Sequence, residues 1–208
     1  MNLALELSHG IEHLGLDIPI ATQQNMLVYL ELLQKWNKVY NLTAIRQPEQ
    51  MVTHHLLDSL AVLPHLWMGR WLDVGCGAGL PGLVLAMAKP EWKFTLLDSN
   101  SKKTSFVQQA IIDLKLSNVN VCCARAEEWE PNEKFDGIIS RAFAELADFI
   151  AATRHLLADG GRWIAMKGHL ERELKMLPAD IKIEQIILLQ VPGLKAARRL
   201  AVLQINQE

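Results

Sequence analysis

The sequence is poor in cysteine and has no spacing typical of a zinc site. An odd number of cysteines without a Cys-x-x-Cys pair argues against both a disulfide framework and structural zinc. The 208 residues contain Cys76, Cys122 and Cys123. We interpret these as reduced core thiols. His54 and His55 lie near Asp58, but no further ligands follow at a suitable spacing, so we expect no metal.

A membrane-length apolar run and a strong net charge are also missing. The apolar run at residues 80–88 is too short to cross a bilayer and contains Pro81 and Gly82. The N-terminus carries Glu6 and Glu12 where a signal peptide has a basic region. We therefore expect a cytoplasmic protein without a membrane anchor. The formal net charge is −2, so a nucleic-acid partner would have to be held by a local basic cluster.

The chain divides into two parts that differ in the spacing of their apolar residues. Residues 1–68 are predicted to be helical, since apolar residues such as Leu3, Leu7 and Ile11 recur at helical spacing, and Thr22 is a plausible N-cap. We expect this N-terminal extension to pack on a domain at residues 69–208, together forming one compact unit.

The second part alternates short β-rich runs with helical stretches, which predicts right-handed βαβ units and a doubly wound α/β fold. Runs at 183–191 and 200–205 flank Pro192-Gly193 and predict an antiparallel pair at one edge of the sheet. The parallel strands are expected at 71–74, 93–97, 119–123, 137–140 and 162–167. The helices are expected at 81–89, 102–114 and 146–157, the last closed by a turn at 159–161.

A glycine-rich turn follows the first predicted strand. Gly77-x-Gly79-x-x-Gly82, with Asp98 21 residues after Gly77, matches a dinucleotide fingerprint and suggests NAD. However, Asp73 precedes Gly75 by two residues, and a carboxylate there would repel a pyrophosphate. It would suit the ammonium group of S-adenosylmethionine, which has no phosphate. We favour the methyl donor; a nicotinamide cofactor and a turn without any ligand are the alternatives.

Cations follow three predicted strands. Arg125, Arg141 and Lys167 each come directly after such a strand or within two residues of its end. Because the carboxyl ends of parallel strands share one edge, these side chains should converge beside the cofactor. That convergence favours an anionic substrate such as RNA. Arg198 and Arg199 extend the cluster or protect a sheet edge, and Glu127 recognises adenine or starts a solvated helix.

Seven short motifs are spread over nearly the whole chain. They are Trp36-Asn37-Lys38-x-Tyr40-Asn41-Leu42-Thr43, His55-x-x-Asp58-Ser59, Asp73 to Gly82, Leu97-Asp98-Ser99 with Lys102-Lys103, Arg125-x-Glu127, Ser140-Arg141-Ala142-Phe143 and Met166-Lys167-Gly168. With these motifs the sequence resembles a known family, the RsmG (GidB) guanine-N7 methyltransferases of bacterial 16S rRNA, and the motifs at residues 36–43 and 140–143 are the most distinctive. Cys76-x-Ala78 departs from the Thr and Pro of many members, at positions that supply backbone to the loop.

The resemblance implies a class I (Rossmann-like) methyltransferase with a seven-stranded, mostly parallel sheet whose last strand is antiparallel. It implies methylation of N7 of guanine 527 in 16S rRNA, in the small ribosomal subunit or its assembly intermediate. We expect a monomer that catalyses by positioning, through Arg125, Arg141 and Lys167. The expected cofactor contacts are Asp73, Gly75, Gly77, Gly79, Leu80, Asp98, Ala126, Glu127 and Arg141. The expected RNA contacts are Asn41, His55, Arg125, Lys167 and Arg199.

Other functions remain open on the sequence. A nicotinamide oxidoreductase would need a group that donates or accepts a proton during hydride transfer, and none is identifiable. A non-catalytic RNA-binding or ribosome assembly factor would keep S-adenosylmethionine as a structural ligand. A small-molecule methyltransferase is disfavoured by the basic strand ends.

Overall fold

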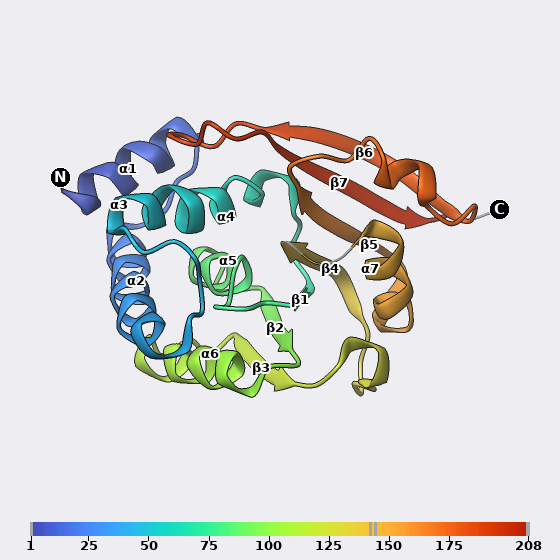
Figure 1. Ribbon diagram of the computed structural model, residues 1–208, viewed down its shortest axis with the longest axis horizontal. Coiled ribbons are helices and arrows are strands. Elements are labelled where there is room, and N and C mark those ends of the chain that lie inside the picture. The colour runs from blue at the N-terminus through green and yellow to red at the C-terminus, as the bar shows by residue number, and fades with distance from the viewer. Residues whose placement is uncertain (1, 142, 144, 207–208) are drawn as a thin grey trace.

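A twisted sheet flanked by helices on both faces forms the centre of the chain (Figure 1). The computed structural model describes residues 2–141, 143 and 145–206. In this part the sheet has seven strands in the order β3-β2-β1-β4-β5-β7-β6. The strands are β1 (Arg70–Val74), β2 (Lys93–Asp98), β3 (Val119–Cys123), β4 (Phe135–Arg141), β5 (Leu157–Lys167), β6 (Ile181–Leu189) and β7 (Arg198–Ile205).

The strand directions confirm the predicted topology. β1 to β5 pair in parallel, and β7 runs antiparallel between β5 and β6. β1 lies between β2 and β4, so the chain order reverses there. In open α/β sheets, ligands bind at the carboxyl ends of the strands beside such a reversal. This places a candidate site at the ends of β1, β2 and β4.

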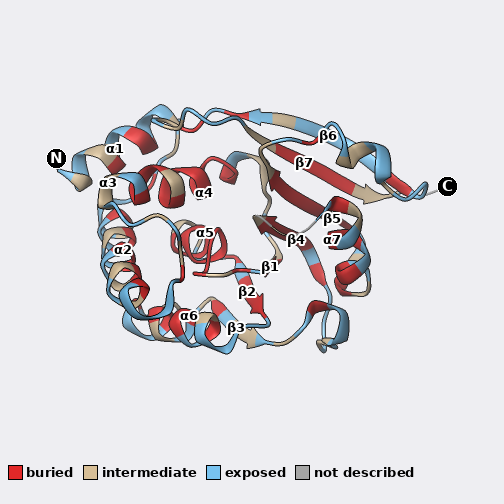
Figure 2. Ribbon diagram, in the orientation of Figure 1, coloured by how far each residue is buried: buried red, intermediate tan, exposed pale blue. Residues whose placement is uncertain are grey.

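Alternating side chains of the strands supply two separate cores. Trp71 of β1 packs in the core that includes the N-terminal helices, and the next residue, Leu72, packs in the core on the opposite face. Helices α5 (Gly82–Ala88) and α6 (Ser101–Asp113) cover the first face, and α7 (Leu146–Thr153) covers the second. Figure 2 shows the buried residues concentrated along the inner strands, whereas β6 is largely exposed at the edge.

The N-terminal segment is helical, as predicted. Its long helix α2 (Ile20–Tyr40) contacts α5 and α6. Tyr29 on α2 is fully buried, and its hydroxyl donates to the carbonyl of Ala78 in the glycine loop at 2.7 Å. The predicted N-cap, Thr22, is wrong: Pro19 is the N-cap, because its carbonyl accepts from Gln23 N and its extended backbone leads into the helix. The elements are α1 (Leu3–His13), α2 (Ile20–Tyr40), α3 (Pro48–Met51), the π-helix η1 (Val52–Leu57), α4 (Asp58–Leu60) and the short 3-10 helix η2 (Leu63–His65).

Three details differ from the prediction. The helix expected to reach residue 157 ends at Thr153 and continues as the 3-10 helix η4 (Arg154–Leu156). The expected turn at 159–161 lies inside β5: Phe135 pairs with Leu157 but Gly137 pairs with Arg162, so β5 carries a bulge there. Cys76 is buried, but Cys123 is exposed and is no core thiol. In the described residues, no helix is long and apolar enough to cross a membrane.

Candidate active site

Two neighbouring cavities lie at the carboxyl ends of the central strands. The first has a volume of about 350 Å³ and the second about 420 Å³, and Phe143 lines both. The first is lined by Val74, Gly75, Leu97, Asp98, Ser99, Lys103, Ala124, Arg125, Ala126, Glu127 and Phe143. The second is lined by Ile45, His54, His55, Asp58, Arg141, Phe143, Met166, Lys167, Gly168 and Arg198. A larger cavity, between α1 and Pro192-Gly193, is lined by none of the residues predicted for the site.

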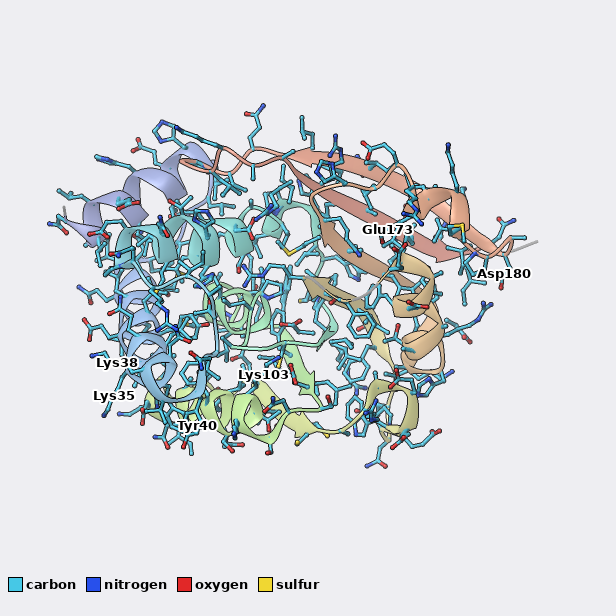
Figure 3. All side chains as sticks on the ribbon, in the orientation of Figure 1. Lys35, Lys38, Tyr40, Lys103, Glu173 and Asp180 are labelled. Atoms are coloured by element: carbon cyan, nitrogen blue, oxygen red, sulfur yellow. The ribbon has the colours of Figure 1, made fainter. Side chains whose placement is uncertain are left out.

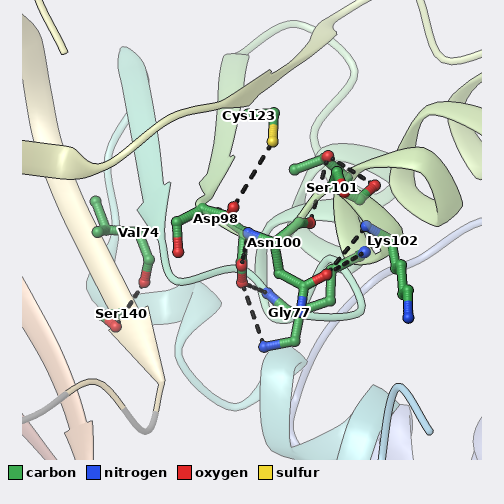
Figure 4. Close-up of polar contacts among 11 residues, drawn as sticks. Val74, Gly77, Asp98, Asn100, Ser101, Lys102, Cys123 and Ser140 are labelled. Carbon is green, nitrogen blue, oxygen red and sulfur yellow. Dashed lines mark hydrogen bonds and ion pairs between the residues drawn. The ribbon is translucent and has the colours of Figure 1, made fainter. Parts of the chain in front are cut away.

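The glycine loop between β1 and α5 forms one wall of the first cavity. Gly75 N donates to Leu97 O at 2.8 Å, and Gly77 N donates to Asp98 Oδ2 at 3.0 Å (Figure 4). Gly75 has φ +67°, and a Cβ atom there would lie 3.2 Å from the Phe143 ring. The loop thus needs glycine both for its left-handed backbone and for the close approach of Phe143.

Asp98, at the end of β2, is the central carboxylate of the first cavity. It is 7% exposed. Its Oδ1 accepts from Asn100 N at 2.9 Å (Figure 4), and Lys103 Nζ lies 3.6 Å from Oδ2. A carboxylate oriented by backbone donors at a strand end is suited to accept hydrogen bonds from the two hydroxyls of a ribose.

Asp73 lies behind the loop and does not line the first cavity. It is fully buried, and its Oδ2 accepts from Gly82 N at 2.8 Å. Burial raises the pKa of Asp73 to about 7, against the opposing effects of the Gly82 N–H and of Arg141. Its Oδ1 has no hydrogen-bond partner among the described residues. A buried acceptor without a partner beside this loop fits a cationic ligand, reached directly or through water.

The residues of the first cavity fit S-adenosylmethionine. Asp98 and Glu127 are acceptors for hydroxyl and amine groups, and the backbone of Gly75 and Ala126 provides the remaining wall. A dinucleotide would bring a pyrophosphate to the glycine loop, close to Asp98 in the cavity wall and to Asp73 behind the loop. The charge of these two carboxylates therefore favours the methyl donor over a nicotinamide cofactor.

Charged side chains in the second cavity form two networks. In one, buried Asp58 accepts from Arg141 at 3.2 Å and from Arg198 at 2.9 Å. In the other, Lys167 Nζ lies 2.9 Å from the carboxylate of Glu173, a residue labelled in Figure 3. Glu173 begins the 3-10 helix η5 (Glu173–Met176). Lys167 also donates to Phe143 O at 3.3 Å. The second cavity is therefore rich in hydrogen-bond donors, and its cations are already oriented by carboxylates.

His55 connects the second cavity to the tryptophan-containing motif of α2. Its Nε2 lies 3.0 Å from Thr43 Oγ1. Thr43 is held in turn by Asn37, whose amide donates to Thr43 O at 3.0 Å and accepts from Thr43 N at 2.9 Å. Asn37 is 3% exposed. The motif therefore fixes the loop after α2 and, through it, the imidazole of His55.

We expect His55 to make the protein less stable in mild acid. Burial and the charge of Arg141 lower the pKa of His55 to about 4, against about 6.5 in the unfolded chain. As the pH falls from about 6.5 toward 4, His55 is protonated in the unfolded state but stays neutral in the native state. The contribution of His55 to the free energy of unfolding therefore decreases over this range. Between pH 7 and pH 5 the chain should lose roughly 2 kcal/mol of unfolding free energy relative to His55→Gln, as measured by urea unfolding. The raised pKa of Asp73 acts in the opposite direction, but equally in both proteins.

The control for this prediction is His9→Gln, which changes an exposed histidine of α1. It should keep the pH dependence of the unmodified chain. An equal loss in the chain and in His55→Gln would contradict the prediction.

The cavities bring together most of the residues predicted for the site. Gly75, Asp98, Arg125, Ala126 and Glu127 line the first cavity. His55, Arg141 and Lys167 line the second. The strand-end cations thus lie in two adjoining cavities instead of one, with Arg125 separated from the other two.

The remaining predicted residues lie in the surroundings of the cavities. Gly77, Gly79 and Leu80 shape the loop, and Leu80 is buried in the core. Arg199 pairs with Glu171 at 3.3 Å and donates to the carbonyl of Gly168, which lines the second cavity. Asn41 ends α2 in a left-handed conformation, exposed and bonded to Arg46, and lines neither cavity.

Sequence reasoning missed two residues of the site. Phe143 and Asp58 stand in motifs noted in the sequence, but their roles become visible only from their position between the cavities and between two arginines. Arg198 was predicted to extend the basic cluster or to protect a sheet edge, and in the structure it lines the second cavity and pairs with Asp58. Ala142, in the same motif as Phe143, lies outside the described residues.

Comparison with known proteins agrees on one family. Residues 22–202 match the GidB family model, described as rRNA small subunit methyltransferase G. Ribosomal RNA small subunit methyltransferase G of Laribacter hongkongensis is 50% identical over 207 residues, covering 99% of this chain and 100% of that protein.

Solved structures are similar in fold. TrmN from Thermus thermophilus has a TM-score of 0.59 and 21% identity, covering 71% of this chain and 48% of that chain. The N-methyltransferase NodS from Bradyrhizobium japonicum, solved with S-adenosyl-L-homocysteine, has a TM-score of 0.56 and 16% identity, covering 86% of this chain and 98% of that chain. At these identities the likeness concerns the fold alone.

Proposed function

The chain belongs to the GidB family of rRNA small subunit methyltransferases, and on this premise we propose that it methylates N7 of guanine 527 in 16S rRNA. It is an S-adenosylmethionine-dependent methyltransferase, as its family and its fold show. The specific base and atom are the proposal. The observation that carries it is the pair of adjoining cavities that share Phe143, the first formed by the glycine loop with Asp98 and Glu127, the second rich in cations.

The first cavity is proposed to hold the cofactor. Asp98 accepts from the ribose hydroxyls, Glu127 and the backbone of Ala126 recognise the adenine, and Gly75 lets the loop approach closely. Asp73 supports the loop through Gly82 and offers its second oxygen toward the ammonium group. When bound, S-adenosylmethionine supplies an electrophilic methyl group. Arg125 lies in this cavity's wall and is assigned to phosphate or base near its opening.

The second cavity is proposed to hold the guanine and its neighbouring phosphates. Guanine N7 already carries an exposed lone pair, so no residue has to remove a proton before the attack. Lowering of the pKa of His55 keeps its imidazole neutral near pH 7, so it adds no charge to the cavity. Lys167 and Arg141 orient the RNA, and catalysis rests on alignment. The guanidinium of Arg141 lies on the RNA side, so its expected cofactor contact stays a prediction.

The remaining expectations concern organisation. We propose that residues 1–68 form a helical extension on the domain at residues 69–208, and that the chain acts as a monomer. Its substrate is the small subunit or an assembly intermediate, and its place of action is then the cytoplasm, where subunits are made. No metal is required by the proposed reaction.

The experiment that tests the function uses small subunits that lack the modification. The chain and labelled S-adenosylmethionine are incubated with these subunits, with naked 16S rRNA, or with modified subunits. The labelled base is then mapped. We expect one methyl group on N7 of guanine 527 and none in modified subunits. Label on another base or atom would refute the assignment, and cofactor binding without any transfer would favour an assembly factor.

A further inference from the structure

Asp58 is a buried carboxylate that the proposed reaction does not use. Its side chain is 1% exposed, and it stands at the junction of the π-helix η1 and α4. It accepts from two guanidinium groups that come from distant segments, Arg141 at the end of β4 and Arg198 at the start of β7. The described residues around Asp58 thus join the N-terminal helices to two strand ends of the sheet.

The two arginines keep donors available after these contacts. Arg141 also donates to His54 O at 2.8 Å, and Arg198 donates to Ala197 O at 3.3 Å. Each guanidinium has five N–H groups, and each of the two arginines donates two hydrogen bonds within the described residues, so three N–H groups remain for a ligand. Both side chains are partly exposed and line the second cavity.

A shared carboxylate changes what the two arginines can bind. Two like charges close together repel each other, and one buried carboxylate between them offsets this and fixes the plane of each guanidinium. The cluster of two arginines and one aspartate keeps a net positive charge. Oriented, partly exposed guanidinium groups are suited to bidentate contact with phosphate oxygens.

We propose that Asp58 is a positioning residue that aligns Arg141 and Arg198 into a clamp for one backbone phosphate of the RNA. This inference rests on the proposed function, because it names the second cavity as the RNA side. The anion is assigned to the RNA and not to the carboxylate of the cofactor, since Arg198 and Asp58 line the second cavity and not the first.

The sign of one substitution separates positioning from simple electrostatics. Asp58→Asn removes a negative charge beside an RNA site, so electrostatics alone predicts tighter RNA binding. Misaligned arginines predict the opposite. We expect Asp58→Asn to weaken binding to unmodified small subunits about 10-fold and to lower the slope of log Kd against log salt by about 0.7 to 0.9, as for one lost phosphate contact.

The measurement is a salt titration of labelled protein against small subunits at fixed magnesium. Arg198→Gln should lose as much affinity as Asp58→Asn, and the double variant should lose no more than either. Binding of S-adenosylhomocysteine should change less than 3-fold in each; an equal loss there would move the clamp to the cofactor and overturn the proposal. Asp180→Asn is the matched control, because it breaks the exposed Arg154–Asp180 ion pair near the C-terminal end (Figure 3) and should bind normally.

Unchanged or tighter binding by Asp58→Asn, or losses that add in the double variant, would overturn the clamp. If Asp58→Asn does not fold, Arg198→Gln alone decides, and an unchanged salt slope contradicts the proposal. Failure of the proposed function has a different signature, since the unmodified chain would then bind subunits without methylating N7 of a guanine.

Discussion

Replacing Asp98 with alanine is expected to weaken S-adenosylhomocysteine binding at least about 100-fold. The substitution removes the acceptor for the ribose hydroxyls, and charge-assisted hydrogen bonds contribute roughly 1.5 to 3 kcal/mol each. It also releases Gly77 N and Asn100 N, which Asp98 holds at 3.0 and 2.9 Å, so the glycine loop keeps only its backbone bonds to Leu97 of β2. Isothermal titration calorimetry measures the loss.

The matched control is Asp113→Ala on α6. Asp113 is exposed and bonded to Gln109, away from both cavities. It should leave the affinity unchanged. Normal binding by Asp98→Ala would show that the first cavity does not hold the ribose.

Replacing Lys167 with alanine is expected to lower the rate of RNA methylation about 100-fold or more and to spare cofactor binding. Lys167 is 14% exposed and lines the second cavity only. Loss of one correctly placed cation at a reacting centre disturbs alignment, and misalignment is costly when a reaction depends on positioning. Single-turnover transfer to small subunits measures the rate, and titration with S-adenosylhomocysteine measures the affinity.

Two further variants define what Lys167 does. Glu173→Gln keeps the lysine but removes its ion pair, and should cost much less activity than Lys167→Ala. Lys175→Ala, on the same 3-10 helix, removes an exposed lysine and should have no effect. If Glu173→Gln is as damaging as Lys167→Ala, the lysine supports the structure around Phe143 instead of the RNA.

Local chemistry made the sheet and the glycine loop predictable. From residue 70 onward, the spacing of apolar residues distinguishes strands from helices. Gly75 and Gly77 occupy left-handed backbone positions that favour glycine, and Asp98 accepts from Gly77 N. The boundaries that failed depend on tertiary pairing. Residues 159–161 read as a turn, but the pairing of β5 with β4 continues past them through a bulge.

The relation between the cations could not be read from the sequence. Strand order puts Arg125, Arg141 and Lys167 at one edge of the sheet, but it says nothing about which carboxylates meet them. Asp58 and Glu173 come from the N-terminal helices and from a 3-10 helix after β5, and only their packing brings them to Arg141 and Lys167. The position of Phe143 between two cavities is likewise a product of the fold.

The central claim is that the first cavity holds the cofactor and opens past Phe143 toward the second. A crystal structure with S-adenosylhomocysteine tests this most directly. Density for the ligand should contact Gly75, Asp98 and Glu127, with its sulfur directed toward Arg141 and Lys167. Density outside this cavity, or a sulfur facing away from those two residues, would contradict the account.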